Sequence, residues 1–453
     1  MDRRLQRRRL LLKGAATTVA ALVGQGASRR RAETRAAVAR RQVSGRLRYR
    51  LAAATPDEIW VAQDFLRITF GRLFPDVEVT VEPAPSGEDP LLAEMESGTA
   101  PDVFDTWRDA VVKYADRGQI LDLGPMVERD LSAEEVADHF PWQWRDFVLP
   151  SGLRFGMPKY VNVVVLWYNR DMFDEAGLAA PDDSWMHETY ADAARRLTRR
   201  DGEQVTTWGL YYPAFALDRF FSKVEAWGGH LVDPEDPTRA AFDSDEALAA
   251  AEWARALTFD DRANARRDHL FPAGGGGVAD TIGRFADGQL AMVEDGFYPF
   301  STAVGVGDRF RWGYAPVPRG PVRRRSLGTA GGFAVWAGTP HQEAAWELVK
   351  FLSGPEYQLE LTVLTGYLPN RFSILTEWKE ICTRLFPVLA DANLDVAPQA
   401  MADGYPANRP LFSRDADAQA LIGPALERVF VTGEAPVNHL ADIARQVTET
   451  LRR

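Results

Sequence analysis

The chain has 453 residues, which is long enough for two or more domains, and carries 53 Lys and Arg against 64 Asp and Glu. Its first 50 residues hold 15 of those basic residues and two of the acids, so the other 38 basic and 62 acidic residues give the body a net charge of −24. Such an acidic body argues against nucleic-acid binding and favours a monomer, and the single cysteine, Cys382, excludes an intramolecular disulfide.

The chain opens with a basic and apolar segment, RRRLLLKGAATTVAALVGQGA, from Arg7 to Ala27. Its paired arginines, leucine triplet and Lys13 resemble the twin-arginine export motif, and the apolar run that follows is shorter than the about 20 residues that span a bilayer. A basic disordered arm is the alternative. We expect an export signal and basic segment over residues 1–45 and a soluble periplasmic protein. No cysteine lies near the end of the signal, so no lipid anchor is expected there.

The pattern of the body predicts an α/β fold. An apolar strand over 47–54 is followed by helical spacing over 56–73, which Pro75 ends, and then by alternating valines from Val77 to Val81. The order strand, helix, strand predicts a parallel sheet with crossover helices. The same patterns continue in strands 102–104 and 161–168 and in helices 110–117, 342–352, 357–364 and 438–451.

Patterns for catalysis or metal binding are weak. The six histidines stand apart without metal-ligand spacing, so neither a metal nor a cofactor is expected. Gly274–Gly277 lacks the Gly-Lys-Ser/Thr of a phosphate loop and predicts a surface turn. Glu294 and Asp295 could supply the two carboxylates of a glycosidase, but neighbours on a strand face opposite ways. We therefore expect a protein that is not an enzyme.

Aromatic residues are abundant, at 13 Trp, 12 Tyr and 24 Phe. Sugars present flat C–H faces and a rim of hydroxyls, which suit aromatic plates combined with carboxylate, amide and backbone acceptors. For each aromatic residue a place in the hydrophobic core is the alternative, and the set together indicates a carbohydrate site. Those at loop junctions beside Gly, Pro or acids are Trp107, Tyr160, Trp227, Tyr298 and Tyr367.

Five motifs follow one another across nearly the whole body. They are APDVFDTW with KYADRGQILDL, then GLRFGMPKYVNVVVLWYNRDMFDEAGL, then FADGQLAMVEDGFY before WGYAPVPRGP, then TAGGFAVWAGTPHQEAAWELVKFLSGPEYQ, and last TGYLPNR. In this order they resemble the extracellular solute-binding proteins of bacterial ABC importers, in the sugar-binding family that includes maltose-binding protein.

The resemblance implies a type II periplasmic-binding-protein-like fold, with two α/β lobes joined by strand crossovers and a ligand cleft between them. Residues 46–160 and 331–390 would form lobe 1, and residues 161–330 and 391–453 would form lobe 2. It also implies binding without chemistry. The lobes would close about a hinge on a carbohydrate or related polar solute, which is then delivered to an ABC permease driven by a cytoplasmic ATPase.

The ligand site is expected at the carboxyl ends of the strands. Asp105 and Trp107 follow the strand 102–104 at such an end, where open α/β sheets bind ligands. The resemblance adds Asp109 as a ligand-contacting acid, with a helix N-cap as its alternative. It also places Asn162 where the family has a sugar-contacting acid, and the amide can both donate and accept hydrogen bonds.

Other candidates come from the later motifs. Tyr298 matches a stacking tryptophan of the family, and Glu294 on the preceding strand could accept a bond from a hydroxyl or could face solvent. Gly331 and Gly332 lie at the second crossover, where a bare backbone can approach a ligand closely, or where a hinge lies without ligand contact. The remaining candidates are Tyr160, Tyr367, Asp218 and Trp227.

Two other functions remain open at this point. A secreted glycosidase would share the aromatic site and would need two carboxylates within roughly 5–10 Å of each other. A solute sensor would keep the same clamp and engage a membrane receptor instead of a permease. Within transport, a polyol or glycerol-phosphate could replace the sugar.

Overall fold

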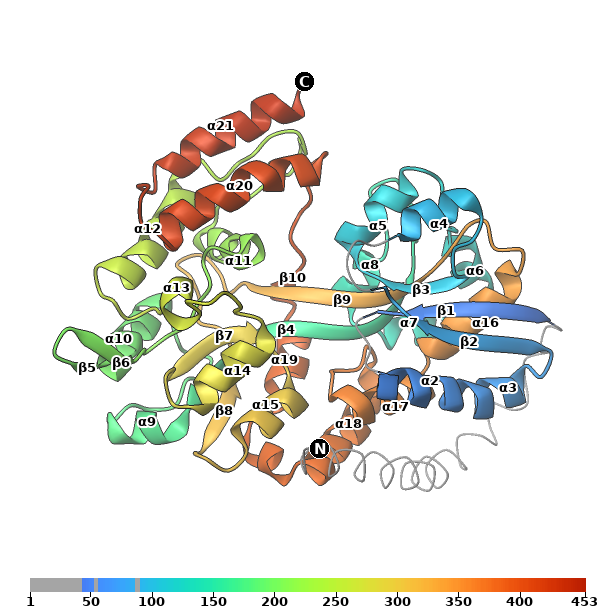
Figure 1. Cartoon of the computed structure of the whole chain (residues 1–453), viewed down its shortest axis with the longest axis horizontal. Coiled ribbons are helices and arrows are strands. Elements are labelled where there is room, and N and C mark those ends of the chain that lie inside the picture. The colour runs from blue at the N-terminus through green and yellow to red at the C-terminus, as the bar shows by residue number, and fades with distance from the viewer. Residues whose placement is uncertain (1–42, 53–55, 86–89) are drawn as a thin grey trace. The chain divides into compact units, whose positions relative to one another are not determined.

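The computed structural model describes residues 43–52, 56–85 and 90–453, so the expected export signal, Arg7–Ala27, lies outside the described residues. The chain divides into two compact units (Figure 1). Unit 1 runs to Val161 and resumes over Ala330–Cys382, and unit 2 holds Asn162–Thr329 and Thr383–Arg453. The expected lobe boundaries after residues 160 and 330 lie one residue from these crossings, whereas the third crossing comes after Cys382 rather than after residue 390.

The elements of unit 1 are β1 (Gly45–Leu51), α2 (Pro56–Ile68), α3 (Phe70–Leu73), β2 (Val77–Pro83), α4 (Leu91–Ser97), β3 (Val103–Thr106), α5 (Arg108–Ala115), α6 (Gly124–Asp130), α7 (Ala133–Ala137), α8 (Pro141–Asp146), α16 (Gln342–Leu352), α17 (Pro355–Thr365) and the 3-10 helix η1 (Phe372–Ile374). The chain passes between the units within β4 (Met157–Asn169), β9 (Ser326–Val335) and α18 (Leu375–Leu385).

The sheet of unit 1 follows the predicted order of strand, helix and strand. β1 pairs in parallel with β2, with Leu47 opposite Val79, and in parallel with β3, with Tyr49 opposite Val103. β9 pairs with β3 in the antiparallel sense, with Gly332 opposite Thr106. The predicted parallel sheet with crossover helices is therefore confirmed for β1, β2 and β3.

Two hydrophobic cores lie on the two faces of this sheet, because successive residues of a strand face opposite sides. Val103 packs into one core with the fully buried Trp346 of α16, and Phe104 packs into the other with Tyr114 of α5. Figure 1 shows α4 and α5 on one side of the strands and α2 and α17 on the other.

The single helix predicted over 56–73 is wrong at one point, because α2 and α3 are separate helices that meet at Thr69. The Thr69 hydroxyl donates a hydrogen bond to the backbone oxygen of Phe65, four residues earlier, at 2.6 Å. Such a bond from a threonine to the preceding turn competes with regular helix geometry and bends the chain.

The elements of unit 2 are α9 (Arg170–Glu175), α10 (His187–Leu197), β5 (Arg199–Asp201), β6 (Gln204–Thr207), α11 (Leu217–Trp227), α12 (Asp245–Phe259), α13 (Arg267–Leu270), α14 (Val278–Ala286), β7 (Met292–Gly296), α15 (Pro299–Val306), β8 (Trp312–Ala315), the 3-10 helix η2 (Pro387–Asp391), α19 (Val396–Asp403), β10 (Pro406–Ala407), α20 (Asp415–Phe430) and α21 (His439–Leu451).

The sheet of unit 2 differs from the prediction. β4 is antiparallel to both β7 and β8, with Leu166 opposite Glu294 on one side and Ala315 on the other. The prediction that the parallel pattern of strand, helix and strand continues at 161–168 is therefore wrong. An apolar run identifies a strand, but the direction of its partners depends on pairing between distant segments.

The helices predicted in the last third of the chain are present in the structure. The predicted segments 342–352, 357–364 and 438–451 are confirmed as α16, α17 and α21. The predicted surface turn at Gly274–Gly277 is also confirmed: it precedes α14, and Gly274, Gly275 and Gly276 have positive φ angles of 86°, 106° and 101°. Within the described ranges, no helix combines the length and the apolar character of a membrane span.

Candidate ligand-binding site

A pocket of about 110 Å³ in unit 1 collects six of the twelve residues predicted to bind ligand: Asp105, Trp107, Tyr160, Gly331, Gly332 and Tyr367. They come from the end of β3, the start of α5, the first half of β4, β9 and the segment after α17. The other residues that line it are Leu51, Ala52, Ala62, Thr106, Lys159, Tyr357, Leu361, Leu364 and Thr365.

The polar part of the pocket is a buried ion pair. The Lys159 ammonium lies 2.5 Å from Asp105 Oδ2, and the two side chains are 7% and 3% exposed. Asp105 also accepts hydrogen bonds from the Tyr49 hydroxyl at 2.8 Å and from the backbone N–H of Ala52 at 2.9 Å. Burial, reinforced by the Asp105 carboxylate, raises the pKa of Tyr49 well above its usual value, so Tyr49 stays a neutral donor.

Two stacked tyrosines form the aromatic part. The rings of Tyr160 and Tyr367 have centroids 4.7 Å apart and planes inclined by 28°. Gly331 makes room for them, since a Cβ atom there would lie 2.6 Å from the Tyr160 ring. The glycine thus allows close approach by an aromatic ring of the protein, and it also lines the pocket. Trp107 stands before α5 with extended backbone and is half-buried.

Buried amides and a hydroxyl hold the strand that carries Lys159 and Tyr160. The backbone oxygen of Pro158 accepts bonds from the Ser353 hydroxyl at 2.7 Å and from Asn370 Nδ2 at 2.5 Å. The backbone oxygen of Tyr160 accepts from Gln143 Nε2 at 3.0 Å. These bonds fix both sides of Lys159, so the ammonium and the Tyr160 ring are positioned before any solute arrives.

Asp109 is exposed on the first turn of α5 and lies outside the residues that line the pocket. The alternative prediction, that Asp109 caps this helix, is wrong because the N-cap position belongs to Trp107. Sequence spacing gives the start of a helix only to within one or two residues, which is the size of this error. A contact between Asp109 and a ligand remains a prediction.

Glu360 on α17 gives unit 1 a testable pH dependence. Burial raises the pKa of its carboxyl from 4.5 to about 7. Between these values the folded protein keeps a proton that the unfolded chain releases, so the free energy of unfolding falls as pH rises. Glu360→Gln should remove this fall. At pH 8 the free energy of unfolding of the variant should therefore exceed that of the natural protein by up to about 3 kcal/mol. Urea unfolding at pH 4.5 and pH 8 measures this difference. Glu356→Gln is the control, because Glu356 is exposed and its loss should leave the pH dependence of stability unchanged. An unchanged pH dependence in Glu360→Gln would contradict the raised pKa of Glu360.

In unit 2 the structure brings together Asn162 and Tyr298. Asn162 Nδ2 donates to the Tyr298 hydroxyl at 3.0 Å, and Asn162 Oδ1 accepts from the backbone N–H of Phe297 at 3.0 Å. The Tyr298 ring lies over Gly296, where a Cβ atom would come within 2.5 Å of it. Both side chains are half-buried, so the amide orients an aromatic surface that remains partly accessible.

Glu294 does not face solvent, so the alternative prediction of an exposed side chain is wrong. It is 1% exposed, and both of its carboxylate oxygens lie 2.7 Å from Lys223 Nζ. The Tyr190 hydroxyl donates to Glu294 Oε2 at 3.2 Å, and the Lys223 ammonium lies 4.8 Å from the centre of the Tyr212 ring. The lysine partner is 71 residues away in sequence, so the pattern around Glu294 could not reveal it.

Asp295, the neighbour of Glu294, pairs with Arg219 at 2.5 Å and accepts the backbone N–H of Gly296 at 2.7 Å. The two adjacent carboxylates therefore engage two different cations, Lys223 and Arg219, on α11. Each carboxylate is thus held in an ion pair of its own.

The last two candidates are both occupied by protein contacts. Trp227 is 8% exposed and packs on Trp253, with ring centroids 5.2 Å apart, and against His187 at 4.8 Å. Asp218 has a side chain that is 53% exposed and accepts a bond from Arg409 Nε at 3.0 Å. Trp227 thus takes the place in a hydrophobic core that was its alternative.

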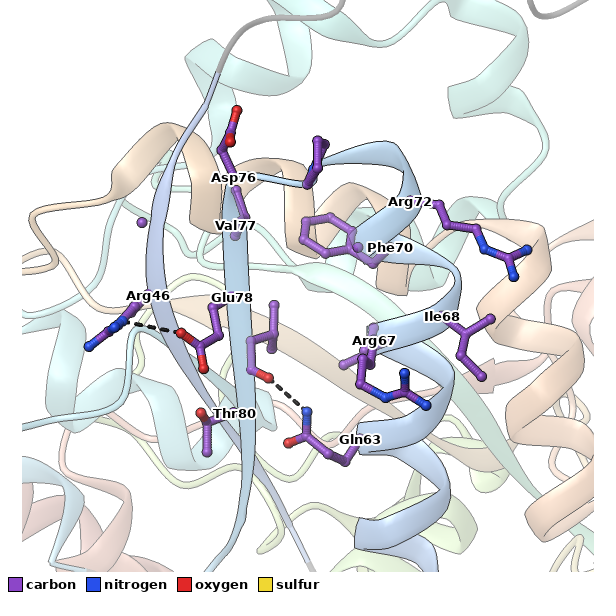
Figure 2. Close-up of a pocket in the computed structure, with 15 residues that line it drawn as sticks. Arg46, Gln63, Arg67, Ile68, Phe70, Arg72, Asp76, Val77, Glu78 and Thr80 are labelled. Atoms are coloured by element: carbon purple, nitrogen blue, oxygen red, sulfur yellow. Dashed lines mark hydrogen bonds and ion pairs between the residues drawn. The ribbon is translucent and has the colours of Figure 1, made fainter.

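A larger groove of about 880 Å³ lies between α2 and the outer strand β2 of the sheet, and none of the predicted ligand residues lines it (Figure 2). Figure 2 shows Gln63 of α2 reaching the strand, where its amide donates to the Val79 oxygen at 2.8 Å and accepts from the Val81 N–H at 2.7 Å. Arg46 and Glu78 form an exposed pair at 3.1 Å. Gln63 therefore occupies backbone groups that an edge strand would otherwise present to another chain.

Among the lining residues that were not predicted, Lys159 is the charged one. It stands in GMPKYVN, where apolar residues surround it, and a charged residue in a buried strand requires a partner. That pattern could have predicted an ion pair, although not its partner, Asp105. Across the described residues, no group of three or more His, Cys, Asp and Glu side chains could hold a metal ion.

Comparisons with known proteins place this chain in a family. The sequence profile described as bacterial extracellular solute-binding protein matches residues 52–359, more than half of the chain. An uncharacterised lipoprotein of Streptomyces antibioticus is 26% identical over 72% of this chain and 70% of its own length. The maltotriose-binding protein of Pyrococcus abyssi is 23% identical over 71% of this chain and 66% of its own length.

The fold also matches a solved structure, the ABC substrate-binding protein of Listeria monocytogenes in complex with cycloalternan. It aligns with a TM-score of 0.72 at 20% identity, covering 90% of this chain and 98% of that one. At this identity the likeness concerns the fold, and it confirms the predicted type II periplasmic-binding-protein class. Together with the profile match, it shows that this chain belongs to the bacterial extracellular solute-binding proteins.

Proposed function

We propose that this protein is the substrate-binding component of an ABC importer, that it binds a carbohydrate, and that it delivers this solute to a membrane permease driven by a cytoplasmic ATPase. The observation that carries the proposal is the pocket of unit 1, where Trp107 and the Tyr160–Tyr367 stack line the same space as the Asp105–Lys159 pair. Aromatic faces suit the C–H faces of a sugar, and the ion pair suits its hydroxyls.

The size of the pocket limits what it receives. Pockets that enclose a whole small ligand measure about 300–1,000 Å³, whereas this one measures about 110 Å³. It therefore takes one part of the solute, such as a single sugar ring. The names of relatives that bind maltotriose or were solved with cycloalternan support a saccharide as the solute. Asn162 and Tyr298 remain proposed ligand contacts of unit 2.

The contacts of the two candidate carboxylates bear on the glycosidase alternative. Glu294 is bound by Lys223 and Tyr190, and Asp295 is bound by Arg219. A general acid must be able to give a proton to the leaving oxygen, and a nucleophile must reach the sugar carbon. Both carboxylates are engaged by cations of the protein, which supports binding without hydrolysis.

Export, anchoring and assembly belong to the same proposal. The family is described as extracellular, which supports export, and we propose the twin-arginine route and a periplasmic monomer that closes about a hinge. The relative in Streptomyces antibioticus is named a lipoprotein, so a lipid anchor is the alternative for this chain. Mass spectrometry of the mature protein from a native host distinguishes the two, because an acylated N-terminus would contradict the free form.

A thermal-shift screen of the full chain against mono- and oligosaccharides, polyols and glycerol-phosphate tests the proposal. A ligand at 100 times its dissociation constant adds about 2.7 kcal/mol to the free energy of unfolding. The melting temperature should rise with a saccharide, and Trp107→Ala should abolish the rise. Trp60→Ala is the matched control, because Trp60 is 63% exposed and lies outside the pocket. A folded protein that no saccharide stabilises would overturn the proposal.

A further inference from the structure

The pocket of unit 1 is electrically balanced. Of its fifteen lining residues, all in the described part of the chain, only Asp105 and Lys159 carry a charge, and the two charges oppose each other at 2.5 Å. A lone ammonium in such a site would attract a carboxylate or phosphate, since charge-assisted hydrogen bonds are the strong ones. Asp105 removes that preference.

The pair nevertheless keeps hydrogen-bonding capacity. A carboxylate offers about four acceptor directions, and Asp105 uses three of them on Lys159, Tyr49 and Ala52. An ammonium has three donors, and Lys159 gives one to Asp105. The pair can therefore accept one bond and donate another. Two neighbouring hydroxyls present this combination, because one can donate while the other accepts.

We propose that the Asp105–Lys159 pair determines the charge specificity of the site, so that it selects a neutral sugar ring with neighbouring hydroxyls and rejects its carboxylated counterpart. The inference rests on the proposed function and extends it to the class of saccharide. It separates neutral saccharides from uronates and from phosphorylated solutes such as glycerol-phosphate. The binding of an anionic group would place it against the Asp105 carboxylate, and this repulsion is the element that discriminates.

The test measures a ratio of affinities rather than an affinity. Calorimetric titration of the full chain uses pairs that differ only at C6: glucose with glucuronate, galactose with galacturonate and mannose with mannuronate. The natural protein should prefer the neutral member of the best pair by at least tenfold. Asp105→Asn leaves Lys159 unbalanced and should shift this ratio towards the uronate by at least tenfold. Lys159→Gln leaves Asp105 unbalanced and should shift it the other way.

A control and the contrary results complete the test. Asp102→Asn removes another buried carboxylate near the same strand, which bonds to the Arg48 N–H and Thr339, and should leave the ratio unchanged. If both pocket variants fold, bind and keep the natural ratio, the specificity role is wrong while the proposed function stands. If the natural protein prefers the uronate, or binds none of the six sugars, the inference is also wrong. Loss of binding to every saccharide in the screen would overturn the proposed function itself.

Discussion

Lys223→Met should lower the free energy of unfolding by about 3–5 kcal/mol, as removal of one partner from a buried ion pair does in other proteins. Lys223 and Glu294 are 4% and 1% exposed at the side chain, and the ammonium is enclosed by the rings of Tyr212 and Tyr190. Without the lysine, the Glu294 carboxylate keeps the hydrogen bond from the Tyr190 hydroxyl but loses its cation. Equilibrium unfolding in urea at pH 7 measures the loss.

A double variant separates the buried charge from the packing. Lys223→Met combined with Glu294→Gln removes both charges and keeps the shapes of the side chains. We expect it to recover at least half of the lost free energy, because no unpaired charge remains buried. A loss below about 1 kcal/mol in Lys223→Met, the range of an exposed salt bridge, would show that this pair is not buried in solution.

Gly332→Ala should cost about 2–3 kcal/mol, in the range of overpacked cores. A Cβ atom at Gly332 would lie 1.9 Å from the Phe147 ring and 2.9 Å from the backbone oxygen of Met157. Phe147 is 1% exposed and packs on Phe155 with centroids 5.2 Å apart, so its ring has little room to move. Gly332 also lines the pocket, so the displaced strand should weaken ligand binding as well.

The matched control is Gly283→Ala in α14. Nothing lies within 4 Å of the Cβ position there, and alanine inside a helix is favoured over glycine by about 0.5–1 kcal/mol. The control should therefore raise the melting temperature slightly while Gly332→Ala lowers it by several degrees. Equal effects in the two variants would contradict the close packing at Gly332.

Six residues of the pocket could be predicted because their signals are local. Trp107, Tyr160 and Tyr367 stand at loop junctions in motifs that resemble a known family, and the structure brings all three to one pocket. Asp105 follows β3 at its carboxyl end, where ligands of such sheets bind. In these cases the type of residue and its place at a loop junction or at the end of a strand were enough.

What could not be predicted depends on distant partners. Nothing near Glu294 in the sequence indicates Lys223, and nothing near Lys159 indicates Asp105, 54 residues earlier. The antiparallel direction of β7 beside β4 is likewise decided by pairing and not by composition. The break at Thr69, where the hydroxyl bonds to the Phe65 oxygen, lies within an otherwise helical pattern.

One titration tests the central claim most directly. The tightest saccharide from the thermal screen is titrated into the full chain in a calorimeter, and the contents of the cell are then separated by chromatography. We predict saturable binding of one saccharide per chain and recovery of the sugar unchanged. Release of shorter saccharides would make the protein a glycosidase, and the absence of any binding heat with folded protein would contradict the assignment of carbohydrate as its solute.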